Sequence, residues 1–149
     1  MLNGHKKRRI NILLVEDNAA DIRLTKEVLQ EIEFVKSLNV VRDGVEAINF
    51  LKNKGKYSEV ILPDLILLDL NLPKKGGLEV LKEIKEDEDL KLIPVVILTI
   101  SDVEDDIIKA YKLHVNSYVI KPLEMREFRK IIESIMNYWF IIVKLPERK

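Results

Sequence analysis

The sequence predicts an α/β fold, a doubly wound five-stranded parallel sheet with helices on both faces. Short apolar runs alternate five times with stretches of helical periodicity, and three of the runs (INILLV, LILL and PVVIL) are continuous rather than alternating. Continuous runs are typical of strands that helices cover on both sides. A repeated strand–helix order favours right-handed crossovers within one sheet, and 149 residues suit one domain.

The first half of the chain is expected to form two strand–helix units. The strands are expected at residues 10–15 and 38–41, and helical periodicity follows each of them at 19–33 and 44–54. The apolar faces consist of Leu24, Val28, Leu29 and Ile32 in the first helix and of Val45, Ile48 and Leu51 in the second. The longest loop is expected at residues 53–63, which contain Gly55 and Pro63.

The second half is expected to form three more units. Strands are expected at 65–68, 94–98 and 117–120, and helices at 78–85, 102–113 and 124–140. The last helix has the clearest period, formed by Phe128, Ile131, Ile132, Ile135, Met136 and Trp139. Gly76 and Gly77 are expected to give the third helix a flexible start. We therefore divide the chain into a basic tail at 1–9, one domain at 10–140 and a C-terminal tail at 141–149.

The composition excludes several classes of function. The 25 Lys and Arg residues balance 25 Asp and Glu residues, whereas binding to nucleic acid needs a basic excess. The absence of cysteine excludes disulfides, thiolate metal sites and cysteine nucleophiles, and two histidines are too few for a multi-histidine metal site. Because no secretory signal or membrane-spanning segment is found, we expect a cytoplasmic protein that binds neither nucleic acid nor membrane.

Polar residues follow four of the expected strands. Glu16 and Asp17 follow the first strand, Asp69 follows the third, Thr99 the fourth and Lys121 the fifth. Ligands of open parallel sheets bind at the carboxyl ends of the strands, so these side chains are expected to meet at one edge.

Three crowded carboxylates stay ionised together only beside a cation, and carboxylate oxygens are ligands that Mg²⁺ prefers. An Asp carboxylate can attack phosphorus, while Mg²⁺, Lys121 and the Thr99 hydroxyl would stabilise the charge on the transferring group. The edge of the sheet therefore predicts Mg²⁺-dependent phosphoryl chemistry.

Four motifs occur in an order and spacing that resemble the receiver domain of two-component response regulators, the CheY-like family. They are VEDN (15–18), LLDLNLPKKGG (67–77), ILTIS (97–101) and YVIKP (118–122). VRDGVEA (41–47), LHVNSY (113–118) and an aromatic-rich C-terminal segment make the chain most similar to single-domain regulators that partner phytochrome histidine kinases. The resemblance covers residues 10–140 and implies a flavodoxin-like (βα)5 fold.

The resemblance implies a role for each candidate residue. Asp69 would be the phosphorylated aspartate, and Lys121 would bind the phosphoryl oxygen. Thr99 would move toward the phosphoryl group, and Tyr118 would be the aromatic switch that follows it. The Mg²⁺ ligands would be Glu16, often acting through water, Asp17, Asp69 and the backbone carbonyl of Asn71. The resemblance also implies a cis peptide bond between Lys121 and Pro122.

The implied partners are a sensor histidine kinase and a downstream protein, with self-association through the fourth helix, fifth strand and fifth helix as a further contact. The protein would catalyse only its own phosphorylation and dephosphorylation.

One position departs from the family pattern, since the residue after the switch threonine is usually small and here it is Ile100. Ile100 is expected to narrow access to the phosphoryl site and to restrict Tyr118.

Three alternatives remain at this point. A Mg²⁺-dependent phosphohydrolase would need a second acid two residues after the nucleophile, where this chain has Asn71. A flavodoxin-like cofactor binder would need a loop rich in Ser, Thr or Gly after the first strand, where this chain has Glu16 and Asp17. A receiver-like scaffold that is not phosphorylated would keep the fold without the chemistry.

Overall fold

The computed structural model describes residues 9–146, so the expected basic tail lies outside the described residues except for Arg9. Five strands form one parallel sheet in the order β2-β1-β3-β4-β5. The strands are β1 (Ile10–Val15), β2 (Val35–Val41), β3 (Leu65–Leu68), β4 (Val95–Thr99) and β5 (Ser117–Ile120). The five helices are α1 (Ala19–Gln30), α2 (Gly44–Leu51), α3 (Gly77–Glu86), α4 (Glu104–Lys112) and α5 (Met125–Asn137). The predicted doubly wound fold is confirmed.

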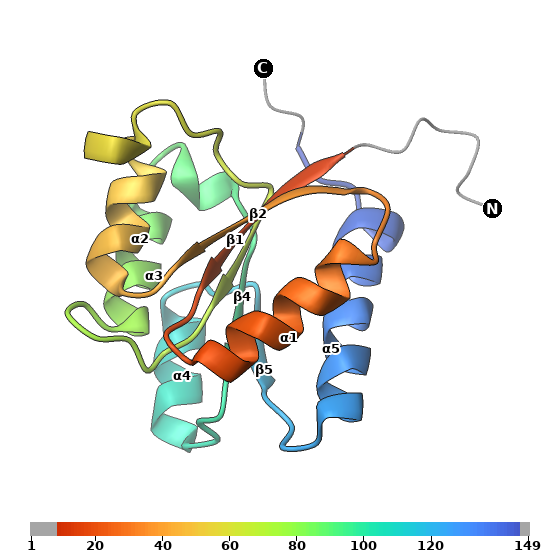
Figure 1. The fold of residues 1–149 in the computed structure, drawn as a ribbon. Helices are drawn as coiled ribbons and strands as arrows, with labels where there is room; N and C mark the ends of the chain where they lie inside the picture. The colour runs from red at the N-terminus through yellow and green to blue at the C-terminus, as the bar shows by residue number, and fades with distance from the viewer. Residues whose placement is uncertain (1–8, 147–149) are drawn as a thin grey trace.

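The helices cover both faces of the sheet (Figure 1). Helices α1 and α5 lie side by side on one face, and α2, α3 and α4 cover the other. Along β1, Leu13 and Val15 belong to the core beneath α2 and α3, whereas Ile12 and Leu14 belong to the core beneath α1 and α5. The central strand β3 is buried along its whole length, which explains why LILL has no polar alternation.

Element ends differ from the predicted ones where edge position or polar residues weaken the pattern. β2 begins at Val35 rather than at residue 38. The prediction missed the first three residues because Lys36 and Ser37 interrupt the apolar run of this edge strand. The last helix was predicted to reach residue 140, but α5 ends at Asn137 and a π-helical turn follows at Tyr138–Ile142. That turn places the Phe140 ring 6.2 Å from the Phe34 ring, between centroids, and both residues pack on the α1–α5 core.

None of the helices within residues 9–146 has the length and apolar character that a bilayer crossing requires.

Two glycines allow the loop after β3 to pack closely against its neighbours. A Cβ at Gly77 would lie 2.4 Å from the Asp69 carbonyl oxygen and 2.6 Å from the Leu70 Cα. A Cβ at Gly44, the first residue of α2, would lie 1.9 Å from the Lys75 carbonyl oxygen. The predicted flexible helix start therefore does not explain Gly77, since the close backbone contact beside Asp69 leaves no space for a side chain.

We expect Gly77→Ala to lower the free energy of unfolding by about 1–3 kcal/mol, because the backbone at Asp69 and Leu70 must move to admit the methyl group. Gly76→Ala is the matched control. Its Cβ would meet nothing closer than 4.0 Å, and its φ of −71° suits alanine. Because Gly76 is the N-cap of α3, where alanine is less favourable than glycine, stability should fall by no more than about 0.5–1 kcal/mol. Urea unfolding measures both, and equal midpoints for the two variants would contradict the close-packing explanation.

Candidate functional site

The carboxyl ends of four strands meet at one edge of the sheet, as the sequence predicts. The strand register places Val15 opposite Leu68, and Thr99 opposite Ile120. Glu16, Asp69 and Lys121 are the residues that follow directly on β1, β3 and β5. Their side chains are almost completely buried, which requires that their charges compensate one another.

The ammonium group of Lys121 is the centre of the site. Its Nζ lies 2.5 Å from Glu16 Oε1, 2.8 Å from Asp21 Oδ2 and 3.3 Å from Asp69 Oδ2. The side chain is only 4% exposed, so all of its charge is neutralised by these three carboxylates. The Lys121 backbone N–H also donates to the Thr99 carbonyl oxygen at 2.7 Å, which ties β5 to β4. The Lys121–Pro122 peptide bond is trans, so the implied cis bond is wrong.

Burial and charge shift the pKa values of the site in different directions. Burial opposes the charge on Lys121, but hydrogen bonds to Asp21 and Glu16 outweigh it and raise the pKa of the ammonium. Burial also opposes ionisation of Asp69, yet the contacts with Glu16, Lys121 and Thr99 together hold its pKa below the usual value. Burial, together with the neighbouring Asp69 carboxyl, raises the pKa of Glu16 to about 7. Glu16 is therefore the carboxyl of the site that takes up a proton most readily.

Thr99 and Tyr118 are linked through Ser101. The Thr99 hydroxyl is fully buried, interacts with the Asp69 carboxyl, and accepts a hydrogen bond from the Ser101 N–H at 3.4 Å. The Tyr118 hydroxyl donates to the Ser101 carbonyl oxygen at 2.9 Å. Ser101 in turn donates from its Oγ to Asp106 Oδ2 in α4 at 2.7 Å. A chain of contacts therefore runs from Asp69 to the half-buried Tyr118 ring and to α4.

Asp17 and Asn71 lie at the margin of the site. The Asp17 side chain is 54% exposed and faces Arg42, with 3.9 Å between Asp17 Oδ1 and the Arg42 Nε. Asn71 is exposed, and its backbone N–H donates to Asp69 Oδ1 at 3.3 Å. The structure thus brings Glu16, Asp69, Thr99 and Lys121 together and leaves the side chain of Asp17 outside the group.

The site fits a hard divalent cation by its chemistry. Every anionic group of the site is a carboxylate, whose oxygens suit such a cation. The three carboxylates, of Glu16, Asp21 and Asp69, outnumber the one ammonium that neutralises them. As arranged, these carboxylates surround Lys121 Nζ, and among the described residues no three acidic or histidine side chains are grouped as cation ligands. A cation would therefore share or replace the lysine as the counter-charge of the carboxylates.

Sequence reasoning missed Asp21 and Arg42. Asp21 occupies the first turn of α1, where its backbone N–H donates to the capping Asn18 side chain, and its carboxylate reaches Lys121. Its position four residues after Asp17, one turn into a helix that starts at the same edge, is the signal that could have identified it. Arg42 follows directly on β2, and only the strand order shows that β2 lies beside β1.

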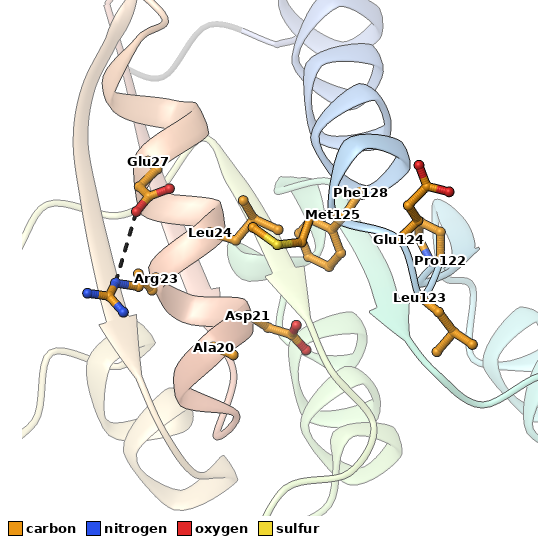
Figure 2. Close-up of a pocket in the computed structure, with 10 residues that line it drawn as sticks. All are labelled: Ala20, Asp21, Arg23, Leu24, Glu27, Pro122, Leu123, Glu124, Met125 and Phe128. Carbon is orange, nitrogen blue, oxygen red and sulfur yellow. Dashed lines mark ion pairs between the residues drawn. The ribbon is translucent and has the colours of Figure 1, made fainter.

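A cavity of about 480 Å³ adjoins the site between α1 and the start of α5. Figure 2 shows Leu24 of α1 and Met125 of α5 pointing toward one another across it, and the Arg23–Glu27 ion pair of α1 also contributes to its lining. Asp21 both lines the cavity and contacts Lys121, so the two features are continuous. Leu123 and Met125 are 99% and 69% exposed, which gives the cavity an apolar rim.

The chain is similar to known proteins in both sequence and fold. The sequence model of one protein family, the response regulator receiver domain, matches residues 12–133 of this chain. Response regulator Rcp1 of Synechocystis sp. is 50% identical over 135 residues, which are 91% of this chain and 92% of Rcp1. The crystal structure of the phosphorylated cyanobacterial phytochrome response regulator RcpA is similar with a TM-score of 0.91 and 48% identity, over 93% of this chain and 99% of that one. The Mn²⁺-bound form of Rcp1 gives 0.87 and 49%, with the same coverage. The resemblance inferred from the motifs is confirmed.

We expect Lys121→Met to lower the free energy of unfolding by about 3 kcal/mol at neutral pH in the presence of a chelator. The substitution leaves Glu16 and Asp69 buried without their cation, and proton uptake by Glu16 limits the loss to the lower end of the range for a broken buried pair. Adding Glu16→Gln should recover part of the loss, because one uncompensated charge is removed.

Urea unfolding of the single and double variants gives these values. Lys112→Met, on the exposed face of α4, is the control for loss of a lysine and should change stability little. Equal stabilities for Lys121→Met and Lys112→Met would contradict the central role of the Lys121 ammonium.

Proposed function

Because this chain belongs to the response regulator receiver family, we propose that it is a signalling switch in which Asp69 accepts a phosphoryl group from a sensor histidine kinase. The observation that supports this most strongly is the environment of Asp69. Its carboxylate is buried at the carboxyl edge of the sheet, interacts with the Thr99 hydroxyl, and lies 3.3 Å from the Lys121 ammonium. An ionised carboxylate with a cation and a hydroxyl donor beside it is the arrangement that phosphoryl transfer needs.

In the proposed reaction, an Asp69 carboxylate oxygen forms a bond to phosphorus while the bond from phosphorus to the donor breaks. The low pKa of Asp69 keeps that oxygen ionised and nucleophilic. Lys121 and Thr99 are placed to neutralise and hydrogen-bond the oxygens of the incoming group. Mg²⁺ would supply the remaining positive charge, held by Asp17, Asp69 and the Asn71 backbone carbonyl, with Glu16 beside it.

The contacts of Ser101 suggest how phosphorylation would be read. A movement of Thr99 toward a phosphoryl group would displace the Ser101 backbone, whose carbonyl holds the Tyr118 hydroxyl. Tyr118 lies in β5, so the change would reach the surface formed by α4, β5 and α5. Ile108, Tyr111 and Ile120 are exposed on this surface and offer apolar contacts to a downstream protein or to a second copy of the chain.

The cavity beside Asp21 is a suitable docking place for the kinase. A donor must approach Asp69 from the carboxyl edge of the sheet, and the apolar rim at Leu123 and Met125 adjoins that edge. The phytochrome regulators among the relatives point to a phytochrome-type sensor kinase as the donor. The chemistry of the chain itself would then be limited to gaining and losing the phosphoryl group.

Intact mass after incubation with acetyl phosphate tests the proposal. We expect one phosphoryl adduct on the wild-type protein in Mg²⁺, and loss of the adduct in Asp69→Asn or in a chelator. Asn is close in shape and removes one crowded carboxylate, so the variant should remain folded. Asp102→Asn, an exposed aspartate in the loop before α4, is the control and should be labelled like the wild type. Full labelling of Asp69→Asn would refute the assignment of the acceptor.

We also expect Ile100→Ala to shorten the lifetime of the phosphorylated protein by a few-fold. Ile100 directly follows Thr99 and is 63% exposed, so its truncation opens the approach of water without leaving a cavity. The decay of the adduct mass after removal of the donor gives the lifetime. Val103→Ala, a neighbouring exposed apolar residue, is the control. If Ile100→Ala leaves the lifetime unchanged, Ile100 does not limit the rate of dephosphorylation.

A further inference from the structure

We propose that Arg42 lowers the affinity of the site for a divalent cation, because its guanidinium competes with the cation for the Asp17 carboxylate. This inference rests on the proposed function, in which Asp17 is a ligand of the cation. It concerns a residue outside the buried group, directly after β2, the strand next to β1.

The position of Arg42 is fixed by the pairing of β1 with β2. Val15 and Val41 are opposite one another in the register, and the Glu16 N–H donates to the Val41 carbonyl oxygen at 3.0 Å. Arg42 follows Val41, so its side chain starts beside the segment that contains Asp17. Its Nη2 donates to the Asp17 carbonyl oxygen at 3.2 Å, and its Nε lies 3.9 Å from the Asp17 Oδ1.

In this contact the Asp17 carboxylate lies beside Arg42 and outside the buried group. The structure gives Asp17 a charged partner in Arg42, whereas Glu16, Asp21 and Asp69 share Lys121. A cation that binds Asp17 together with Asp69 must draw the carboxylate away from the guanidinium. The ion pair is exposed on both sides, 58% for Arg42 and 54% for Asp17, so breaking it costs little.

The larger effect comes from the charge that stays behind. The 3.2 Å hydrogen bond to the Asp17 carbonyl does not involve the carboxylate, so it can keep the guanidinium in place after the carboxylate has turned toward a cation. A fixed positive charge next to a ligand then repels the doubly charged ion. Ion-pair competition and repulsion act in the same direction, and both lower the affinity of the site for a divalent cation.

Titration with Mn²⁺, followed by the electron paramagnetic resonance signal of the free ion, tests the proposal without a phosphorylation step. We expect Arg42→Gln to bind Mn²⁺ about three- to ten-fold more tightly than the wild type. Arg42→Lys keeps the positive charge and should stay close to the wild type. Arg129→Gln is the matched control, since it removes the same charge from an ion pair with Glu31 at the opposite end of α1.

The outcomes separate this inference from the proposed function. If Arg42→Gln binds Mn²⁺ as tightly as the wild type does, or more weakly, the proposed role of Arg42 is wrong while the metal site remains in place. An equal gain in Arg129→Gln would also overturn it, because the effect would then follow from net charge alone. A wild-type protein that binds no Mn²⁺ at millimolar concentrations would instead overturn the proposed metal site. Urea unfolding of each variant checks that the fold is retained.

Discussion

The Lys121 ammonium holds together a group of carboxylates that would otherwise repel one another inside the protein. Glu16, Asp21 and Asp69 come from the end of β1, the start of α1 and the end of β3, and Lys121 follows β5. One side chain therefore joins four parts of the fold at its functional edge. The buried positions of Glu16 and Asp69 are tolerable only because this cation is shared among them, since an uncompensated buried charge costs several kcal/mol.

The same arrangement explains why the site is prepared for exchange of its counter-charges. One ammonium among several carboxylates leaves an excess of negative charge, and burial together with the neighbouring Asp69 carboxyl raises the pKa of Glu16. In the proposed function, a bound cation would relieve that excess, and a phosphoryl group on Asp69 would restore it and attract the lysine. Asp17 stands apart from this group, with its carboxylate beside Arg42. The carboxyl edge of the sheet is thus held together by a balance of buried charges.

The fold and the core of the site could be predicted from the sequence because both depend on strand ends. The continuous run at β3 identifies a central strand, and the polar residue after it, Asp69, must then lie at the carboxyl edge. Asp21 could not be found in this way, since its role depends on the path of the Lys121 side chain from β5. The contact between Arg42 and Asp17 depends on strand order, and hydrophobic periodicity along the chain does not determine which strands are neighbours.

The long sequence separation within the buried ion pair has a consequence for synthesis of the protein. Glu16 and Lys121 are 105 residues apart, and β5 is an edge strand that only β4 anchors in the sheet. A nascent chain on the ribosome therefore presents the acidic edge well before the lysine that neutralises it emerges. The Glu16 and Asp69 carboxylates of that edge gain this ammonium only when β5 has docked beside β4.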